Sequence, residues 1–298
     1  MSKPQWLKKQ WKETEEMLRV EELVKHLGLN TVCREASCPN YCDCFSRGTA
    51  TFMILGASCT RSCGFCGVTH SIPEPVDPSE AARVAEAVKT LGLLYVVITS
   101  VTRDDLEDGG ASEFAKTVRE IRRLSPGTKV EILIPDFNGS EAALDMVIEA
   151  APDVISHNIE TVKELYEKVR PQADYERSLN VLRYIKNQGD GHGDGSFCVR
   201  SRTQKEPSPC KVKSGFMVGV GETDGLVRET IRDVKNAGCS ILTIGQYLRP
   251  SPANIPVEMY IEPDVFEQWA EYARGIGFEY VASAPFVRSS YHADEALI

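Results

Sequence analysis

The sequence of 298 residues lacks an excess of basic charge, an apolar run of membrane-spanning length and an apolar segment near its N-terminus. Its net charge is −9, whereas proteins that bind nucleic acid generally need a basic surface. No window approaches the roughly 20 apolar residues of a transmembrane helix, and residues 1–16 have no apolar core of the kind found in signal peptides. We therefore expect a cytoplasmic protein that binds neither nucleic acid nor a membrane.

Cysteine, in contrast, is frequent, because the sequence contains ten of them. In a reducing cytosol, clustered thiols hold metals more often than they form disulfides. Six of the cysteines form two groups of three with regular spacing: Cys33-x4-Cys38-x5-Cys44 and Cys59-x3-Cys63-x2-Cys66. We call these the first and the second cysteine group. A disulfide framework is the alternative interpretation.

The spacing within the two groups bears on the identity of the metal. Structural zinc usually takes its four ligands from two short C-x2-C pairs, and only Cys63 and Cys66 form such a pair. Thiolates also bind iron–sulfur clusters. Two groups of three cysteines indicate two clusters, each with one iron left for a ligand other than cysteine. Cys42 adds a thiol inside the first group and could compete with Cys44 as a ligand.

Downstream of the first cysteine group, apolar runs rich in β-forming residues alternate with helical patterns. The predicted strands are 50–55, 94–99, 130–135, 153–157, 215–220 and 241–244. The predicted helices are 79–91, 112–124, 140–150, 162–169, 175–187, 224–237 and 263–276. Roughly six strands that alternate with helices predict an α/β fold, in which a parallel sheet closes into a partial (β/α)6 barrel of the TIM type.

The remaining segments flank this pattern. Residues 1–32 place apolar side chains at roughly helical spacing and predict an amphipathic segment that packs on the barrel; a solvated tail is the alternative. Residues 33–44 show no periodicity and predict a loop shaped by its metal. We expect an N-terminal extension over 1–47, a barrel over 48–250 and a C-terminal extension over 251–298, with both extensions covering the barrel mouth.

Residues 189–213 interrupt the barrel with a stretch rich in Gly, Ser, Pro and charge. This composition predicts a surface insertion between a helix and the fifth strand. Its cysteines, Cys198 and Cys210, are expected to be exposed thiols, with a metal clip or a redox pair as alternatives. Cys239, beside the sixth strand, is expected to be a small buried hydrophobic residue.

In βα barrels the reactive residues gather at the carboxyl ends of the strands. The second cysteine group directly follows the first predicted strand, so we expect it at the barrel mouth. His157, at the end of the fourth strand, is expected to be a structural hydrogen-bonding residue rather than a ligand. Asp104, Asp105 and Asp108 follow the second strand and are expected to shape a loop and form ion pairs.

Two motifs in the sequence resemble those of a known family. The CTRSCGFC stretch over 59–66, with Phe65 before its last cysteine, resembles the cluster motif of the radical S-adenosylmethionine (SAM) superfamily. The first cysteine group and the RSSY stretch over 288–291 are more specific. Together with TVCREASCPN, YVVITSVTRDDLEDGGA, KSGFMVGVGET and PFVRSSYHA in this order, they make the chain resemble the lipoyl synthase family.

The resemblance implies two 4Fe–4S clusters. The second cysteine group would hold a cluster whose fourth iron binds SAM, and an electron from it would split SAM into methionine and a 5′-deoxyadenosyl radical. The first cysteine group would hold an auxiliary cluster, with Ser290 as its fourth ligand. That cluster would be consumed to supply two sulfur atoms, at C6 and C8 of a protein-bound octanoyl-lysine, and so give lipoyl-lysine. The implied metal ligands are Cys33, Cys38, Cys44, Ser290, Cys59, Cys63 and Cys66.

The same resemblance implies that SAM lies over the strand ends. Thr99 and Ser100, at the end of the second strand, would hydrogen-bond its amino acid portion. Asn158 and Glu160, just past the fourth strand, would serve the same pocket. Arg170 would pair with the carboxylate of SAM. Capping or core hydrogen bonds are the alternative role for each of these residues.

The implied partners are an octanoylated lipoyl carrier domain, an electron donor such as a flavodoxin or ferredoxin, and an iron–sulfur carrier that repairs the auxiliary cluster. The chain itself is expected to be a monomer. Two other functions stay open: another radical SAM enzyme with an auxiliary cluster and a different substrate, and an electron carrier or metal-stabilised scaffold. The chain departs from the family at Asn254, where a histidine is common.

Overall fold

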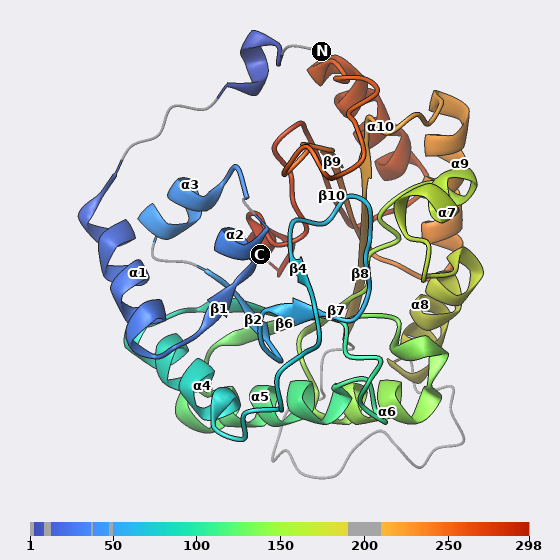
Figure 1. The fold of residues 1–298 in the computed structure, drawn as a ribbon. Coiled ribbons are helices and arrows are strands. Elements are labelled where there is room, and N and C mark those ends of the chain that lie inside the picture. Colours follow the sequence, from blue (N-terminus) through green and yellow to red (C-terminus); the bar gives the residue numbers. More distant parts are fainter. Residues whose placement is uncertain (1–2, 9–12, 37, 48–49, 190–209, 298) are drawn as a thin grey trace.

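The computed structural model describes residues 3–8, 13–36, 38–47, 50–189 and 210–297. At its centre is a sheet in the order β1-β2-β5-β6-β7-β8-β9-β10, surrounded by helices (Figure 1). The six predicted strands are present as β2 (Thr51–Ile54), β5 (Tyr95–Ser100), β6 (Lys129–Leu133), β7 (Val154–Ser156), β8 (Lys211–Val218) and β9 (Ile241–Gln246). Each pairs in parallel with the next, so the predicted partial βα barrel is confirmed.

Two strands at the ends of the sheet are absent from the sequence-based prediction. β10 (Tyr280–Ser283) pairs in parallel with β9, and β1 (Asn30–Thr31) pairs antiparallel with β2. β10 has four residues and β1 has two, and each is defined by its pairing with a neighbouring strand, which forms only on folding. The strand order ends at β1 and β10, so within the described residues the barrel stays open on one side.

Helices connect the strands and cover the outside of the sheet, as predicted (Figure 1). They are α4 (Glu80–Leu91), α5 (Ala111–Leu124), α6 (Glu141–Glu149), α8 (Tyr175–Gly189), α9 (Asp224–Asn236) and α10 (Pro263–Gly275). The predicted helix 162–169 is divided into η3 (Lys163–Leu165) and α7 (Tyr166–Val169). Within the described residues, no helix combines the length and the apolar character needed to cross a membrane.

The N-terminal extension packs on the barrel through α1 (Glu15–His26). Met17, Val20 and Val24 lie on one face of this helix and are buried in the main core. The Thr14 side chain caps the helix by accepting a hydrogen bond from the Met17 backbone N–H. The predicted amphipathic segment is therefore confirmed.

The sequence predicts a loop for the first cysteine group, but most of the group lies in two short helices. These are α2 (Val32–Glu35) and α3 (Tyr41–Ser46). Tyr41 and Phe45 are one helical turn apart, both are buried, and their ring centroids are 4.5 Å apart. This aromatic pair gives α3 a buried face, which contributes to the stability of the helix.

The C-terminal extension returns beneath the barrel. Its last turn, η4 (Ala293–Leu297), places Ala296 against Val154 and Ile241, the first residues of β7 and β9. The hydroxyl of Tyr280, the first residue of β10, donates a hydrogen bond of 3.0 Å to Glu295. This segment therefore closes the barrel at the amino ends of its strands, opposite the mouth.

Of the four cysteines outside the two groups of three, Cys42 lies in α3 beside Cys44, and Cys210 and Cys239 lie at the starts of β8 and β9. Residues 190–209 of the predicted insertion, with Cys198, lie outside the described residues. Cys210 is partly buried against the core rather than exposed as predicted, because β8 begins directly after it. Cys239 is fully buried, as predicted.

A buried ion pair spans the inside of the barrel. Lys213 Nζ on β8 donates to both carboxylate oxygens of Glu131 on β6, at 2.8 and 3.1 Å. Both side chains are 1% exposed, and the Tyr95 hydroxyl on β5 donates a further bond of 2.5 Å to Glu131. β6 and β8 are not neighbours in the sheet, so this pair crosses the interior. The buried charges are tolerated because each has its partner.

Replacing Lys213 by methionine should destabilise the protein strongly, because the Glu131 carboxylate would stay buried without its cation. We expect the free energy of unfolding to fall by about 3–5 kcal/mol. Urea denaturation of anaerobically purified protein, followed by circular dichroism, measures this change.

Two further variants serve as controls. Glu131→Gln in the Lys213→Met background should restore most of the lost stability, since no unpaired charge would then be buried. Lys163→Met removes the exposed ion pair with Glu176 and should leave the unfolding midpoint unchanged. Equal losses in the single and the double variant would contradict the buried-charge explanation.

Candidate active site

The barrel mouth holds a cavity of about 540 Å³, which we call the large cavity. Its walls include residues at the carboxyl ends of β5, β6 and β7, among them Ser100, Leu133 and His157. Parts of both extensions complete it, including Ala36 and Arg288. All three residues of the second cysteine group line this cavity, so their predicted position at the barrel mouth is confirmed.

The second cysteine group lies in a loop that two short strands close. β3 (Ser58–Cys59) and β4 (Thr69–His70) pair in parallel on either side of Cys63 and Cys66. The backbone N–H of Thr102 donates to the Cys59 sulfur at 3.3 Å. Hydrogen bonds to cysteine sulfur stabilise the thiolate form and tune the potential of a bound cluster. The loop therefore holds its three cysteines at the wall of the large cavity.

The first cysteine group and Ser290 surround the boundary between two cavities. Cys33 and Cys38 line the large cavity. Cys44 lines a neighbouring cavity of about 270 Å³, which we call the second cavity. Ser290 lines both. The structure thus brings Cys44 and Ser290 to the same space, although they are far apart in the sequence.

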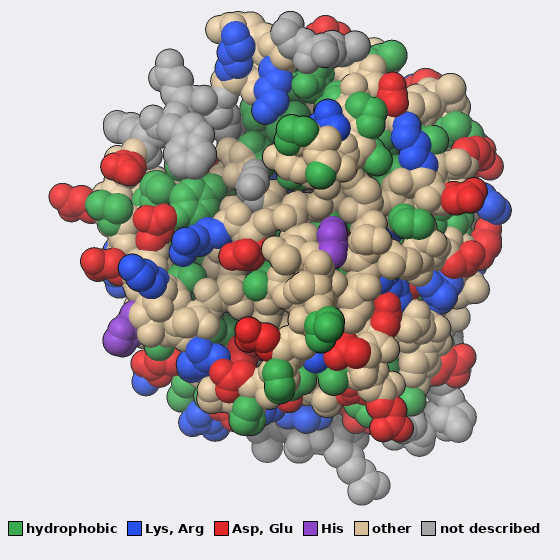
Figure 2. Space-filling view, viewed as in Figure 1, with side chains coloured by type: hydrophobic (Ala, Val, Ile, Leu, Met, Phe, Trp, Pro, Cys, Tyr) green, Lys and Arg blue, Asp and Glu red, His purple; other side chains and the backbone are tan. Residues whose placement is uncertain are grey.

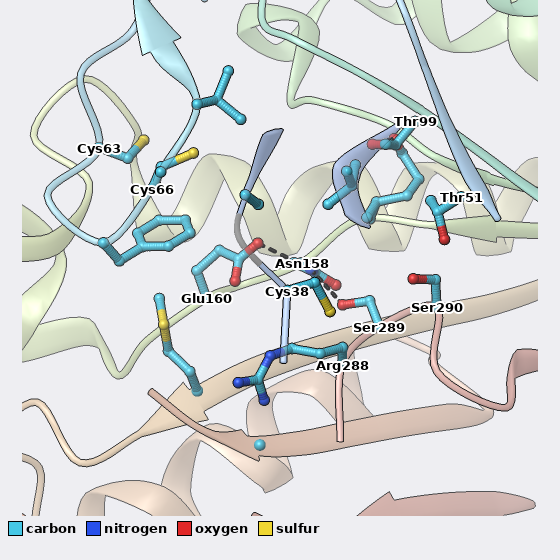
Figure 3. Close-up of a pocket in the computed structure, with 18 of the residues that line it drawn as sticks. Cys38, Thr51, Cys63, Cys66, Thr99, Asn158, Glu160, Arg288, Ser289 and Ser290 are labelled. Atoms are coloured by element: carbon cyan, nitrogen blue, oxygen red, sulfur yellow. Dashed lines mark hydrogen bonds between the residues drawn. The ribbon is translucent and has the colours of Figure 1, made fainter. Parts of the chain in front are cut away.

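Figure 3 shows how the two groups lie around the large cavity. Cys63 and Cys66 are drawn on one side, and Cys38 and Ser290 on the other, with Glu160 between them. The two groups therefore share one barrel mouth.

The two cysteine groups offer ligands of the kind that 4Fe–4S clusters take. No disulfide joins the described cysteines. A 4Fe–4S cluster is held by cysteine thiolates on separate iron atoms, and each group of three thiols could supply such ligands.

Burial makes three of the thiols hard to ionise. It raises the pKa of Cys33 and of Cys66 to about 12. Burial also raises the pKa of Cys63, although the charge of Arg170 opposes this shift. Because the thiolate is the form that binds a metal, a bound metal ion would have to offset the burial of these three sulfur atoms.

Arg61, between Cys59 and Cys63, holds the second cysteine group against the barrel. Its guanidinium donates to Asp104 at 2.7 and 2.8 Å and forms an ion pair of 2.8 Å with Asp136. Its side chain is 4% exposed, and that of Asp136 is 0% exposed. Asp104 follows β5 and Asp136 follows β6, so the arginine ties the cysteine loop to two strand ends. The sequence-based prediction missed Arg61 and Asp136.

Burial alone would raise the pKa of Asp136, but the hydrogen bonds and the charge of Arg61 outweigh it and hold the pKa well below its usual range. The predicted loop-shaping role of the neighbouring aspartates is confirmed. Asp105 pairs with Arg103 at 2.8 Å, and Asp108 accepts from the backbone N–H groups at the start of α5.

Asn254 supports the same cysteine loop from the C-terminal side. Its side-chain amide donates to the backbone oxygens of Cys66 and Gly64, at 2.8 and 3.3 Å. A histidine, which is common at this position in the family that the sequence resembles, also carries an N–H donor. The departure therefore keeps a donor beside the last cysteine of the group.

The predicted SAM-contacting residues all line the large cavity. The two residues at the end of β5, Thr99 and Ser100, differ in whether their hydroxyl group already has a hydrogen-bond partner. Thr99 donates to the backbone oxygen of Leu133 at 2.9 Å, so its hydroxyl proton serves the sheet. The Ser100 hydroxyl is buried and has no hydrogen-bond partner within the described residues. Ser100 is therefore the residue of this pair with a free polar group.

Glu160 is held in a backbone conformation that side chains rarely adopt, with φ of 69°. Its N–H donates to Gly215 and its carbonyl accepts from Met217, which fixes it against β8. Burial raises the pKa of its carboxyl. The Asn158 amide donates to Glu160 at 2.9 Å and to the Ser289 hydroxyl at 2.7 Å, as Figure 3 shows. Asn158 thus joins the strand end to the RSSY stretch.

Arg170 is buried behind this strand end. Its Nη1 donates to the backbone oxygens of Asn158 and Ile159 and to the Tyr166 hydroxyl, at 2.9, 3.2 and 3.1 Å. Its Nε is buried and has no partner among the described residues. Arg170 therefore supports the loop after β7, and its Nε is a donor without a partner among the described residues.

His157 has the structural role predicted for it. Its Nδ1 lies 2.9 Å from the backbone oxygen of Ile134, and the side chain is buried. Burial, together with the charge of Arg170, lowers its pKa to about 4. The imidazole is therefore neutral near pH 7.

Comparison with known proteins assigns the chain to a family. The sequence model described as the radical SAM superfamily matches residues 53–234. A lipoyl synthase from Caldicellulosiruptor saccharolyticus is 52% identical over 293 residues, which cover 98% of this chain and 96% of the relative. A lipoyl synthase from Methylococcus capsulatus is 49% identical over 296 residues, which cover 99% and 86%. This chain belongs to the lipoyl synthase family.

Membership of the lipoyl synthase family makes the chain a radical SAM enzyme, with SAM and 4Fe–4S clusters as its cofactors. Solved structures agree on the fold. Methylornithine synthase has a TM-score of 0.52 at 15% identity and covers 92% of this chain and 84% of its own. Streptococcus suis SuiB bound to SAM has a TM-score of 0.53 at 13% identity, with coverages of 86% and 56%.

The buried His157 should make the stability depend on pH. Its pKa is lower in the folded protein than in the unfolded chain, so its contribution is complete above about pH 6.5 and declines as the pH falls towards about 4. We expect the free energy of unfolding to fall by about 1 kcal/mol more in the wild type than in His157→Gln between about pH 7.5 and pH 5.5. Urea denaturation at both pH values measures this. Parallel pH profiles would contradict the assignment.

Arg61→Met should loosen the second cysteine group, because it breaks the contacts with Asp104 and Asp136 and leaves Asp136 buried without its cation. In a background with alanine in place of the first cysteine group, the iron and sulfide content reports on the second group alone. We expect this content to fall severalfold. Arg103→Met is the matched control, since Arg103 is equally buried but pairs with Asp105 in its own loop. Equal cluster content in the two variants would refute the role of Arg61.

Proposed function

We propose that the chain inserts sulfur at C6 and C8 of a protein-bound octanoyl-lysine and so forms lipoyl-lysine. The observation that carries this proposal is the placing of two cysteine groups and Ser290 around one barrel mouth. Five of the six cysteines and Ser290 line the large cavity, and Cys44 meets Ser290 at the second cavity. A single-cluster enzyme would not need the first cysteine group or the RSSY stretch.

We assign the second cysteine group to the cluster that binds SAM, and the first group with Ser290 to the auxiliary cluster. When bound, the two clusters would supply the electron that cleaves SAM and the sulfur that the product takes up. Serine oxygen is a harder ligand than thiolate, so the Ser290 position should hold iron less firmly than the cysteine positions. Such a weak position suits a cluster that must give up sulfur.

The residues around the large cavity position the substrate and exclude water. The product has two C–S bonds in place of two C–H bonds, and an unactivated C–H bond reacts only with a strong hydrogen abstractor, which a cofactor supplies. Apolar residues such as Val101, Ile134 and Phe216 line the cavity and are buried. They leave space for an alkyl chain and keep the reactive atoms away from solvent.

Polar residues of the cavity would hold SAM. Ser100 has a free buried hydroxyl, and Arg170 has a free buried Nε. Glu160 lies between the labelled cysteines of the two groups in Figure 3, and Asn158 donates a hydrogen bond to it. We propose that these residues bind the amino acid portion of SAM, with Thr99 supporting the strand end that carries Ser100.

The partner of this reaction is a lipoyl carrier domain that presents octanoyl-lysine, and a reductant supplies electrons. We propose a flavodoxin or ferredoxin as the electron donor, an iron–sulfur carrier for repair of the auxiliary cluster, and a monomeric enzyme in the cytoplasm.

On the face that carries β4, acidic and basic side chains are interspersed around the rim, and the centre is mostly uncharged (Figure 2). We further propose that 1–47 and 251–298 act as extensions over a barrel of 48–250.

Anaerobic reconstitution with iron and sulfide, followed by incubation with SAM, dithionite and an octanoyl-lysine peptide, tests the function. We expect the wild type to form the dithiolane, detected by mass spectrometry. Ser290→Ala should lose the dithiolane but continue to cleave SAM, because it weakens only the auxiliary site. Ser283→Ala, which removes a hydroxyl from β10 outside both cavities, should behave like the wild type. SAM cleavage without dithiolane in the wild type would rule out this function.

A further inference from the structure

The second cavity lies directly behind the proposed auxiliary site. It is bounded by the end of α3, the starts of β2 and β5, and the segment that follows Ser290. Thr51 and Ser290 line both cavities, so these two residues form the wall between them. Cys44 lines the second cavity and not the large one. The ligands proposed for the auxiliary cluster therefore face two separate spaces.

The second cavity reaches the protein surface near the amino end of β5. Leu94, which lines it just before β5, is 83% exposed. Arg47 and Asp294 also line it and are exposed. The large cavity, in contrast, lies at the carboxyl ends of the strands. The two cavities thus lead from the auxiliary site towards opposite ends of the barrel strands.

Hydrogen bonds fix the walls of the second cavity. The Tyr291 hydroxyl donates to the Asp43 carboxylate at 2.6 Å. Arg47 donates to the His292 ring at 2.7 Å, and that ring lies 2.7 Å from the Glu295 carboxylate. These contacts join α3 to the segment beyond Ser290. The space behind Cys44 is therefore bounded by side chains held in place from both ends of the chain.

The large cavity is poorly suited to the repair of a consumed cluster, because it has to exclude water and has to hold SAM and the substrate. The large cavity has to exclude water around a radical. Iron ions, in contrast, carry strongly bound water, and bound SAM and octanoyl-lysine would block their way through the large cavity. Ser290 is the ligand proposed to hold iron least firmly, and it lies at the wall of the second cavity. The iron released most easily is thus the one nearest this alternative path.

We infer that the second cavity is the route by which ferrous iron leaves the auxiliary site and by which replacement iron and sulfide return. This inference rests on the proposed function, because it takes the first cysteine group and Ser290 as the ligands of the auxiliary cluster. Each C–S bond that forms between a carbon radical and a cluster sulfide would leave one electron on the cluster, so the iron would leave as hydrated Fe²⁺. The Ser290 oxygen would take up a proton from a water molecule, and the resulting hydroxide would stay with the departing iron.

The test measures iron release from the loaded, full-length enzyme to the chelator ferrozine under anaerobic conditions, with SAM and octanoyl-lysine peptide present. Ala293→Leu adds bulk to the second cavity, and Arg47→Ala removes a side chain from its edge. We expect Ala293→Leu to slow both iron release and reloading with Fe²⁺ and sulfide about tenfold, which corresponds to about 1.4 kcal/mol of added barrier. Arg47→Ala should accelerate both. The dithiolane yield of the first turnover should stay unchanged in the two variants.

The same measurement with alanine in place of the second cysteine group reports on the auxiliary site alone. The inference is overturned if SAM and peptide stop iron release from the wild type, or if neither folded variant changes the rates. Should Ala293→Leu fail to fold, Arg47→Ala at its exposed position decides the outcome. A change in the rates of iron release and reloading in the variants, with no dithiolane formed by them or by the wild type, is a separate outcome. That result would overturn the proposed function and leave the route intact.

Discussion

The candidate site depends on a connection between two segments that are far apart in the sequence. The Asn40 side chain donates a hydrogen bond of 2.7 Å to the backbone oxygen of Phe286, 246 residues away. Asn40 is 1% exposed, so its amide has to be satisfied inside the protein. The bond between Tyr291 and Asp43 repeats the connection a few residues further on. Together they bring Ser290 beside the first cysteine group.

The second constraint is that several charged side chains are buried in the barrel. Arginines and backbone donors beside the buried carboxyl groups offset this burial. Arg61 offsets Asp136 and anchors the cysteine loop, and Arg170 supports the loop that carries Glu160. Asn158 links the proposed SAM pocket to the proposed auxiliary site. Its side chain donates to Glu160 in the pocket and to Ser289, which is next to the proposed iron ligand Ser290. A change in the SAM pocket can therefore reach the auxiliary site through a single side chain.

Local patterns in the sequence were sufficient for the regular part of the fold. Strands such as β5 and helices such as α5 follow from apolar periodicity, and the position of the second cysteine group follows from the strand before it. β10, the Arg61–Asp136 pair and the Asn158–Ser289 bond did not follow, because each depends on residues that meet only after folding. The helix α3 was missed although Tyr41 and Phe45 have helical spacing, since the cysteines around them indicated a loop. The role of Ser290 came from family resemblance, because a lone serine carries no metal signature.

The 246-residue separation between Asn40 and Phe286 also bears on how the enzyme is made. During synthesis the first cysteine group emerges early, long before the segment that carries Ser290. The contacts that Asn254 and Ile255 make with the second cysteine group, in contrast, can form before the last forty or so residues are added. Contacts between distant residues form late in folding. The newly made chain should therefore acquire its two clusters in separate events, with the proposed SAM-binding centre ready for loading before the proposed auxiliary centre.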